Sequence, residues 1–341
     1  MSEILPIIWY VLLAFLLAGY AILDGFDFGV GILHPLARSE QERQIAISAI
    51  APIWDGNEVW LVTFGGALFA AFPEAYATVF SGFYIPFMLV LLALIFRAVS
   101  IEFRSKIDSH RWRRIWDWGF FGSSLLASLL FGVAVGNGLM GIPLDERGLY
   151  LGGFFSLLNP YALLTGLLTV ALFAMHGCLF LYLKTPEGDF RVRLRSWMWH
   201  TWGIFLVLYM LATMYTLLAV PTAVPNFERF PWVGALAVIS VLAIANIPRA
   251  IYMNRAGQAF VSSCVTILML IAITATALFP NLVIASNDLA MSLTIWRAAS
   301  SEKTLQTMLL IAVIGMPFVL AYTVAIYWTF RGQVEPDKSS Y

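Results

Sequence analysis

Long runs of apolar residues dominate the chain and alternate with short polar segments. A helix needs about 20 mostly apolar residues to cross a bilayer. Nine runs of that kind lie near residues 8–30, 53–72, 77–100, 118–136, 160–183, 198–220, 232–248, 258–280 and 305–329. Strands of a membrane barrel would instead alternate apolar and polar residues over about ten positions. The pattern therefore predicts an all-α polytopic membrane protein in which nine transmembrane helices form a single domain, residues 1–341.

The composition excludes several other classes of protein. Apolar residues make up 60% of the chain and charged residues 12%, whereas soluble domains have about 45–50% and about 25%. Disordered chains are poor in apolar residues. The formal net charge is zero, so the chain lacks the basic footprint of a nucleic-acid-binding protein. Its two cysteines, Cys178 and Cys264, lie inside apolar runs and do not form a disulfide framework.

Basic residues between the apolar runs fall mainly on one side of the predicted membrane. Cytoplasmic loops of membrane proteins carry an excess of Lys and Arg. Fifteen lie in the loops after runs 1, 3, 5 and 7 and in the C-terminal tail: Arg38, Arg43, Arg104, Lys106, Arg111, Arg113, Arg114, Lys184, Arg191, Arg193, Arg195, Arg249, Arg255, Arg331 and Lys338. The other side has four, Arg147, Arg229, Arg297 and Lys303. This division predicts an outside N-terminus and a cytoplasmic C-terminus.

Two carboxylates interrupt the first apolar run. Asp24 and Asp27 lie in the stretch DGFDFG, at a spacing that places them about one helical turn apart. A charged residue at membrane depth is costly, usually faces the interior of a helix bundle and marks a functional site. Gly25 and Gly29 predict a close approach between helices, as small residues allow in membrane proteins.

Further charged residues reach the same half of the membrane from the next two runs. Asp55 and Glu58 open the second run, between Trp54 and Trp60, and Arg97 lies near the end of the third. Carboxylates beside an arginine can stay charged at depth, and a chain of them with water can relay protons. We therefore expect Asp24, Asp55, Glu58 and Arg97 to form a proton path.

Structural roles compete with this interpretation. Asp55 and Glu58 have the spacing of a helix N-cap and its partner three residues later. Asp27 could serve as a structural partner for the backbone or a neighbouring helix. Asp24 is harder to explain in this way, because it follows a run of uncharged residues and has no helix end to cap. Arg97 fits the role of countercharge to one of these acids.

No metal site is predicted from the sequence. The His-x₃-His and Cys-x₂-Cys spacings of metal sites are absent. His176 lies inside the fifth run and could ligate a haem, but the other three histidines sit at or beyond the cytoplasmic ends of their runs. Since a bis-histidine haem needs two imidazoles at similar depth, we expect His176 to be a hydrogen-bonded core residue and no haem to be ligated by this chain.

Several motifs together resemble subunit II of the cytochrome bd-type terminal quinol oxidases. They are DGFDFGVG (24–31), WDGNEVWLV (54–62), GGALFAAFP (65–73), FSGFYIP (80–86), FRAVSIEFR (96–104) and SLTIWRAASSEKTL (292–305). The spacing of the first two motifs is the most specific feature, and the similarity extends over almost the whole chain. The nine-span arrangement with an outside N-terminus is also that of this family.

The resemblance implies a function that the composition alone does not. It implies two four-helix bundles plus one extra helix, and a heterodimer with a subunit I that holds two b-type haems and one d-type haem. Such a complex uses membrane quinol and cytoplasmic protons to reduce dioxygen to water in a bacterial or archaeal cytoplasmic membrane, and generates a membrane potential. Asp24 and Asp55 match acidic positions proposed for a proton path, Arg97 matches its basic residue, and Glu58 occupies a Gln-or-Glu position. Some members also hold a structural quinone in subunit II, and some complexes contain small single-span accessory subunits.

Two other classes of membrane protein compete with the oxidase subunit. A secondary transporter or channel would use intramembrane acids to bind a coupling cation, typically in two related halves. Here the acids cluster in the first third of the chain, which argues against that class. A haem-bearing cytochrome in its own right would show haem absorption bands in the isolated chain.

Overall fold

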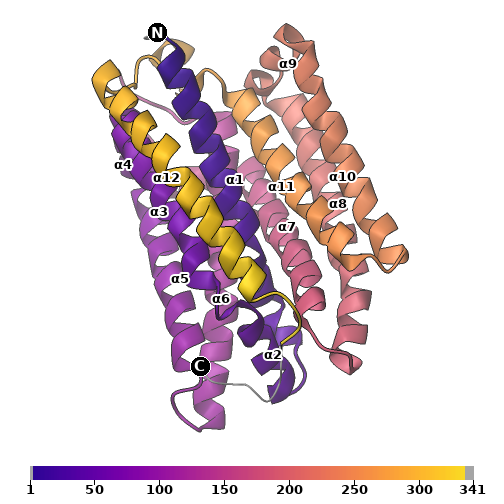
Figure 1. The fold of residues 1–341 in the computed structure, drawn as a ribbon. Coiled ribbons are helices and arrows are strands. Elements are labelled where there is room, and N and C mark those ends of the chain that lie inside the picture. Colours follow the sequence, from indigo (N-terminus) through magenta and orange to yellow (C-terminus); the bar gives the residue numbers. More distant parts are fainter. Residues whose placement is uncertain (1–2, 335–341) are drawn as a thin grey trace.

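The computed structural model describes residues 3–334, which form an elongated bundle of helices (Figure 1). The helices are α1 (Ile4–Leu33), α2 (Glu40–Ile50), α3 (Trp54–Ala71), α4 (Pro73–Gly82), α5 (Tyr84–Phe103), α6 (His110–Met140), α7 (Pro160–Lys184), α8 (Asp189–Ala219), α9 (Pro225–Arg229), α10 (Gly234–Tyr252), α11 (Ala256–Leu278) and α12 (Glu302–Thr329). A short antiparallel pair, β1 (Asn281–Val283) and β2 (Leu293–Thr294), lies in the loop before α12. The all-α prediction is therefore confirmed apart from this small hairpin. Lys338, counted above among the basic residues, lies outside the described residues.

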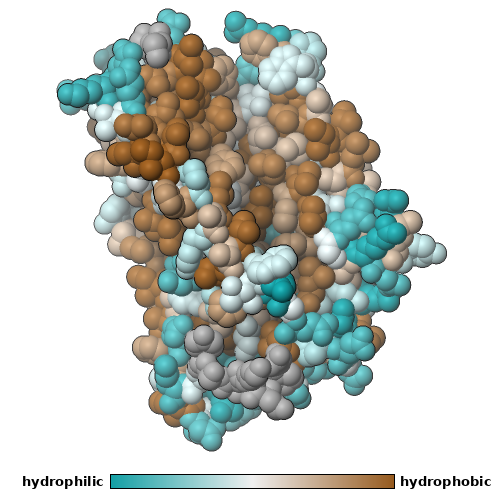
Figure 2. Space-filling view, viewed as in Figure 1, coloured by the Kyte–Doolittle hydropathy of each residue, from teal (hydrophilic) through white to brown (hydrophobic). Residues whose placement is uncertain are grey.

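Eight helices within residues 3–334 are long and apolar enough to cross a membrane: α1, α5, α6, α7, α8, α10, α11 and α12. On the face that Figure 2 shows, apolar residues cover most of the middle of the molecule, and hydrophilic residues lie mainly at its top, bottom and right edge. The chain is thus a multi-pass membrane protein. The predicted second span corresponds to α3. This helix is not one of the eight, because Asp55, Asn57 and Glu58 in its first turns lower its mean hydropathy. Figure 1 shows α3 running alongside α1 between α2 and α4, and its crossing of the membrane stays a prediction.

The predicted third span differs from the observed helices. The apolar run 77–100 is divided between α4 and α5, and the break falls at Phe83. Pro86 lacks a backbone N–H, so it cannot donate the helical hydrogen bond to the carbonyl of Gly82. The apolar pattern also does not predict α2, an eleven-residue helix that the Ser39 side chain caps by accepting from the N–H of Glu42. We refer below to the end of the bundle where α2 lies as the α2 end.

The backbones of α1 and α7 approach each other closely at a pair of glycines. A Cβ placed on Gly29 would overlap the carbonyl oxygen of Phe173 and lie 2.7 Å from the Cα of Gly177. A Cβ on Gly25 would lie 2.9 Å from the Phe173 ring. Because the obstacle at Gly29 is backbone, a side chain there cannot be accommodated by a change of rotamer. The small residue at this position therefore fixes how α1, which carries Asp24 and Asp27, packs in the bundle.

Gly29→Val is expected to destabilise the bundle by about 3 kcal/mol or more, at or above the upper end of the usual cost of overpacking. The thermal unfolding midpoint of the purified protein measures this effect. Gly203→Val on α8 is the matched control, since a Cβ at Gly203 meets nothing within 4 Å. Equal midpoints for the two variants would contradict the close packing of α1 against α7.

Candidate functional site

A buried arginine organises the polar interior of the bundle near the α2 end. Arg97 on α5 is fully buried and forms two contacts with Asp24 on α1, Nη1–Oδ1 at 2.7 Å and Nη2–Oδ2 at 2.9 Å. The same Nη2 lies 2.5 Å from Glu58 Oε1 on α3. The guanidinium also stacks on the Phe28 ring, 4.0 Å from its centroid. A two-point contact of this kind fixes both the position and the charge of the arginine.

Asp27 extends this group toward α12. Asn57 Nδ2 donates hydrogen bonds to Asp27 Oδ2 at 2.7 Å and to the carbonyl of Leu23 at 3.1 Å. The hydroxyl of Tyr327 in turn donates to Asn57 Oδ1 at 2.9 Å. We refer to Asp24, Asp27, Asn57, Glu58 and Arg97 as the Arg97 cluster. It joins α1, α3 and α5, and Tyr327 ties it to the last helix.

The two aspartates of the Arg97 cluster lie three residues apart on α1. Both side chains are fully buried. The cluster also contains three carboxyl groups and a single cation, and an unpaired charge is costly in an apolar interior. The arrangement is therefore suited to holding an exchangeable proton on one of these carboxyl groups.

The surroundings of Glu58 and Asp55 differ from this buried pair. The Glu58 side chain is 26% exposed, so one end of the Arg97 cluster reaches the surface of the chain. Asp55 is exposed on the outer face of α3 and makes no ion pair or hydrogen bond with the described residues of the cluster. The structure thus brings together Asp24, Glu58 and Arg97 from the predicted path, and leaves Asp55 apart from them on an open helix face.

The other residues singled out in the sequence pack the bundle around these groups. Trp54 and Trp60 are buried, and the Trp60 ring contacts Phe15 on α1 with centroids 6.1 Å apart. His176 is fully buried; its Nδ1 lies 2.7 Å from Ser263 Oγ and its Nε2 lies 2.9 Å from the carbonyl oxygen of Ile22. Both ring nitrogens therefore already have partners. Within residues 3–334, no group of three or more His, Cys, Asp or Glu side chains is placed to hold a metal ion.

Asn57 and Tyr327 were missed in the sequence analysis. Asn57 lies inside the motif WDGNEVW, and a carboxamide between two acids in an apolar run could have been flagged by the same argument that singled out Asp55 and Glu58. Tyr327 offers no local signal, because its partner is 270 positions away in the sequence.

Comparisons with known proteins agree with the motif resemblance. Residues 5–330 match the family described as cytochrome bd terminal oxidase subunit II. The chain is 39% identical to cytochrome bd-I ubiquinol oxidase subunit 2 of Escherichia coli strain K12, with 98% of this chain and 96% of that protein covered. It is 34% identical to cytochrome bd ubiquinol oxidase subunit 2 of Bacillus subtilis strain 168, with 96% of each covered. The fold is similar to a chain in the structure of bd oxidase from Geobacillus thermodenitrificans, with a TM-score of 0.76, 18% identity, and 96% of this chain and 98% of that chain covered.

Proposed function

Because the chain belongs to the cytochrome bd terminal oxidase subunit II family, we propose that it is the haem-free partner of a haem-bearing subunit I and conducts protons to it from the cytoplasm. The complex would oxidise membrane quinol and reduce dioxygen to water. The two b-type haems and the d-type haem would lie in subunit I, and this chain alone would not be catalytic. The observation that carries the proton-path part of the proposal is the buried Arg97 cluster, in which two carboxyl groups share one arginine.

The proposed membrane arrangement has nine spans. It includes α3 in addition to the eight apolar helices, with the α2 end in the cytoplasm and the chain arranged as two four-helix bundles plus one extra helix. In this orientation the Arg97 cluster lies in the cytoplasmic half of the membrane. Protons would then reach Asp24 and Asp27 over a short distance, and the much longer route from the outer side would pass the apolar interior of the bundle.

The exposed face of α3 is the proposed contact with subunit I. It presents Asp55, Gly56, Val59 and Val62 on one side of the helix. A carboxylate on a lipid-facing surface is costly, whereas in a contact between subunits it can find polar partners or water. A Cβ on Gly56 would meet nothing within 4 Å of this chain, so another helix can approach closely there. Asp55 would accordingly contribute to the proton path at the junction of the two subunits, next to the exposed end of Glu58.

Co-purification tests the proposed division of roles. We expect the chain expressed alone to show no haem absorption bands, and the chain purified through its own affinity tag together with subunit I to carry all three haems. His176→Ala should leave this haem content unchanged, since both ring nitrogens of His176 already bond within the chain. Haem bound to the isolated chain would contradict the haem-free role.

Cysteine labelling tests the proposed orientation. Glu146 lies in the loop between α6 and α7, Lys106 lies in the loop between α5 and α6 at the α2 end, and both are exposed. In intact cells, a membrane-impermeant maleimide should modify Glu146→Cys and spare Lys106→Cys. The native cysteines give little background, because Cys178 is buried and Cys264 lies within α11. The reverse labelling pattern would contradict the placement of the α2 end in the cytoplasm.

A further inference from the structure

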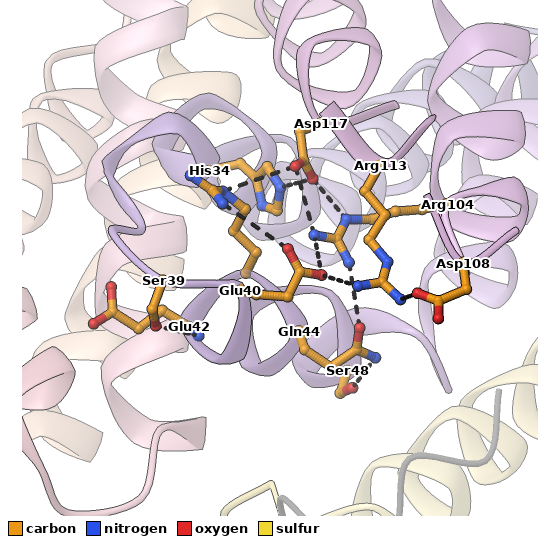
Figure 3. Close-up of polar contacts among 11 residues, drawn as sticks. His34, Ser39, Glu40, Glu42, Gln44, Ser48, Arg104, Asp108, Arg113 and Asp117 are labelled. Atoms are coloured by element: carbon orange, nitrogen blue, oxygen red, sulfur yellow. Dashed lines mark hydrogen bonds and ion pairs between the residues drawn. The ribbon is translucent and has the colours of Figure 1, made fainter. Parts of the chain in front are cut away.

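A second buried polar group lies at the α2 end, where α1, α5 and α6 meet (Figure 3). His34 follows the last turn of α1 and is 2% exposed. Its Nε2 lies 2.6 Å from Asp117 Oδ1 on α6, and Nε of the buried Arg104, just after α5, donates to the same oxygen at 2.6 Å. The ends of α1 and α5 and the start of α6 therefore each contribute one polar side chain to this group.

The ion pairs near His34 join equal numbers of arginines and carboxylates. Four arginines and four carboxylates are linked by ion pairs: Arg43, Arg104, Arg113 and Arg193 with Glu40, Glu42, Asp108 and Asp117. Burial acts to raise the pKa of Glu42, but hydrogen bonds from Arg193 and from the N–H of Arg38 outweigh it and hold the pKa below its usual range. Glu42 is therefore ionised at neutral pH. A proton on the His34 ring would add one positive charge to these paired groups.

One ring nitrogen of His34 is free to take up that proton. Within residues 3–334, its Nδ1 has no hydrogen-bond partner. His34 also lines a cavity of about 10 Å³ together with Arg193 and Trp197 on α8. This volume is close to the minimum that holds one water molecule. The remaining walls of the cavity are mostly apolar, so a proton that enters has few alternative acceptors.

Buried hydroxyl groups continue from His34 toward the Arg97 cluster. On α5, Ser100 is fully buried one turn from Arg97 and one turn from Arg104. On α6, Ser124 is fully buried two turns beyond Asp117, and its hydroxyl has no partner within residues 3–334. Ser124 packs directly against Gly31, which lies one turn from His34 on α1.

Three levels can thus be followed along the junction of α1, α5 and α6. His34 and Arg104 occupy the first level. At the second, Ser100 packs beside Gly119 of α6, and Ser124, a little over one turn further along α6, packs beside Gly31. The Arg97 cluster occupies the third. An orphaned buried hydroxyl is unusual, because burial of an unsatisfied polar group costs free energy. Ser124 is the clearest sign that this junction does more than pack three helices.

We propose that His34 and Ser124 form an interior proton entrance to the Arg97 cluster, separate from the exposed face of α3 that carries Asp55. A proton from cytoplasmic water binds Nδ1 of neutral His34. The resulting imidazolium then releases a proton inward, through water and the Ser124 hydroxyl, to the carboxyl pair of Asp24 and Asp27, and His34 returns to its neutral form. This inference rests on the proposed function, since it adds a route to the proton delivery described above.

The test uses the assembled oxidase and measures oxygen consumption per haem d from pH 6 to pH 9. His34→Gln keeps a neutral side chain that can donate to Asp117 but cannot carry a proton. We expect a loss of about tenfold near pH 9, smaller than the roughly 10²–10⁴-fold contribution of a positioned proton-transfer group because Asp55 offers a parallel entrance. The loss should shrink toward pH 6, where protons are abundant. His110→Gln, which changes an exposed histidine at the start of α6, is the matched control and should follow the wild-type profile.

Ser124→Ala separates proton transfer from a purely structural role. Removal of an unpaired buried hydroxyl should leave stability equal or higher, so an activity loss with the same pH dependence as His34→Gln would come from the proton route. Asp24→Asn is measured alongside. If Asp24→Asn slows turnover while both His34→Gln and Ser124→Ala follow the wild-type profile, the interior entrance is wrong and the proposed function stands. If Asp24→Asn also turns over normally, the proposed function itself fails.

Discussion

Asp24→Asn is expected to slow oxygen consumption by the assembled oxidase about tenfold to 10²-fold per haem d. Asn keeps the shape of Asp24 but cannot hold a proton or a charge. The Arg97 cluster would then lose one of its three carboxyl groups, and with it a site for an exchangeable proton. Transfer by a positioned group commonly contributes about 10²–10⁴-fold to a rate, and parallel acids such as Asp55 reduce the loss.

Haem content and quinol binding should be unchanged in Asp24→Asn, because neither depends on this carboxylate in the proposed division of roles. Asp189→Asn is the control for the loss of one carboxylate, because Asp189 is exposed in the first turn of α8. Asp27→Asn should slow turnover to a similar extent, since it removes the other half of the pair. Wild-type turnover in both variants would contradict a role in proton transfer and leave Asp24 and Asp27 only as structural partners of Arg97 and Asn57.

Arg97→Gln is expected to destabilise the chain by about 3–5 kcal/mol, the usual cost of removing one partner of a buried ion pair. Asp24 is fully buried and would lose both contacts with the guanidinium, whereas Glu58 can turn toward its exposed side. The yield of assembled complex and its thermal unfolding midpoint measure the effect.

A double variant shows whether the cost comes from the unpaired charge. Arg97→Gln combined with Asp24→Asn removes both charges together, so it should recover a large part of the stability lost in Arg97→Gln alone. Groups in direct contact usually show coupling of this kind. If the double variant loses the sum of the two single losses, the pair does not interact as the geometry indicates.

Much of the fold could be predicted from the apolar pattern because spanning helices require long apolar runs. The pattern found eight helices that meet this condition, and a ninth run that contains α3. It did not find the break at Phe83, which depends on the backbone of a single proline, or α2, which is short and only partly apolar. The family assignment drawn from the motifs is confirmed by the match over residues 5–330.

The candidate site was only partly predictable. The sequence places the charged residues of the first three apolar runs in the same half of the membrane. A contact between Asp24 and Arg97 could therefore be expected. The direction in which a side chain points around its helix could not be derived from depth alone. Asp55 and Glu58 lie within one turn of α3, yet Glu58 faces Arg97 and Asp55 faces outward. Tyr327 contacts the site only through Asn57, which lies 270 positions away in the sequence. Ser124 could not be singled out either, because it packs against Gly31 across a helix junction.

Proton uptake during a single turnover tests the central claim most directly. The fully reduced oxidase is mixed with dioxygen in a weakly buffered solution, and a pH indicator follows protons while absorption follows oxidation of haem d. In Asp24→Asn combined with Asp55→Asn, we predict that proton uptake and the final oxidation step slow together, with haem content unchanged. Uptake at the wild-type rate in this double variant would place the proton path outside this chain.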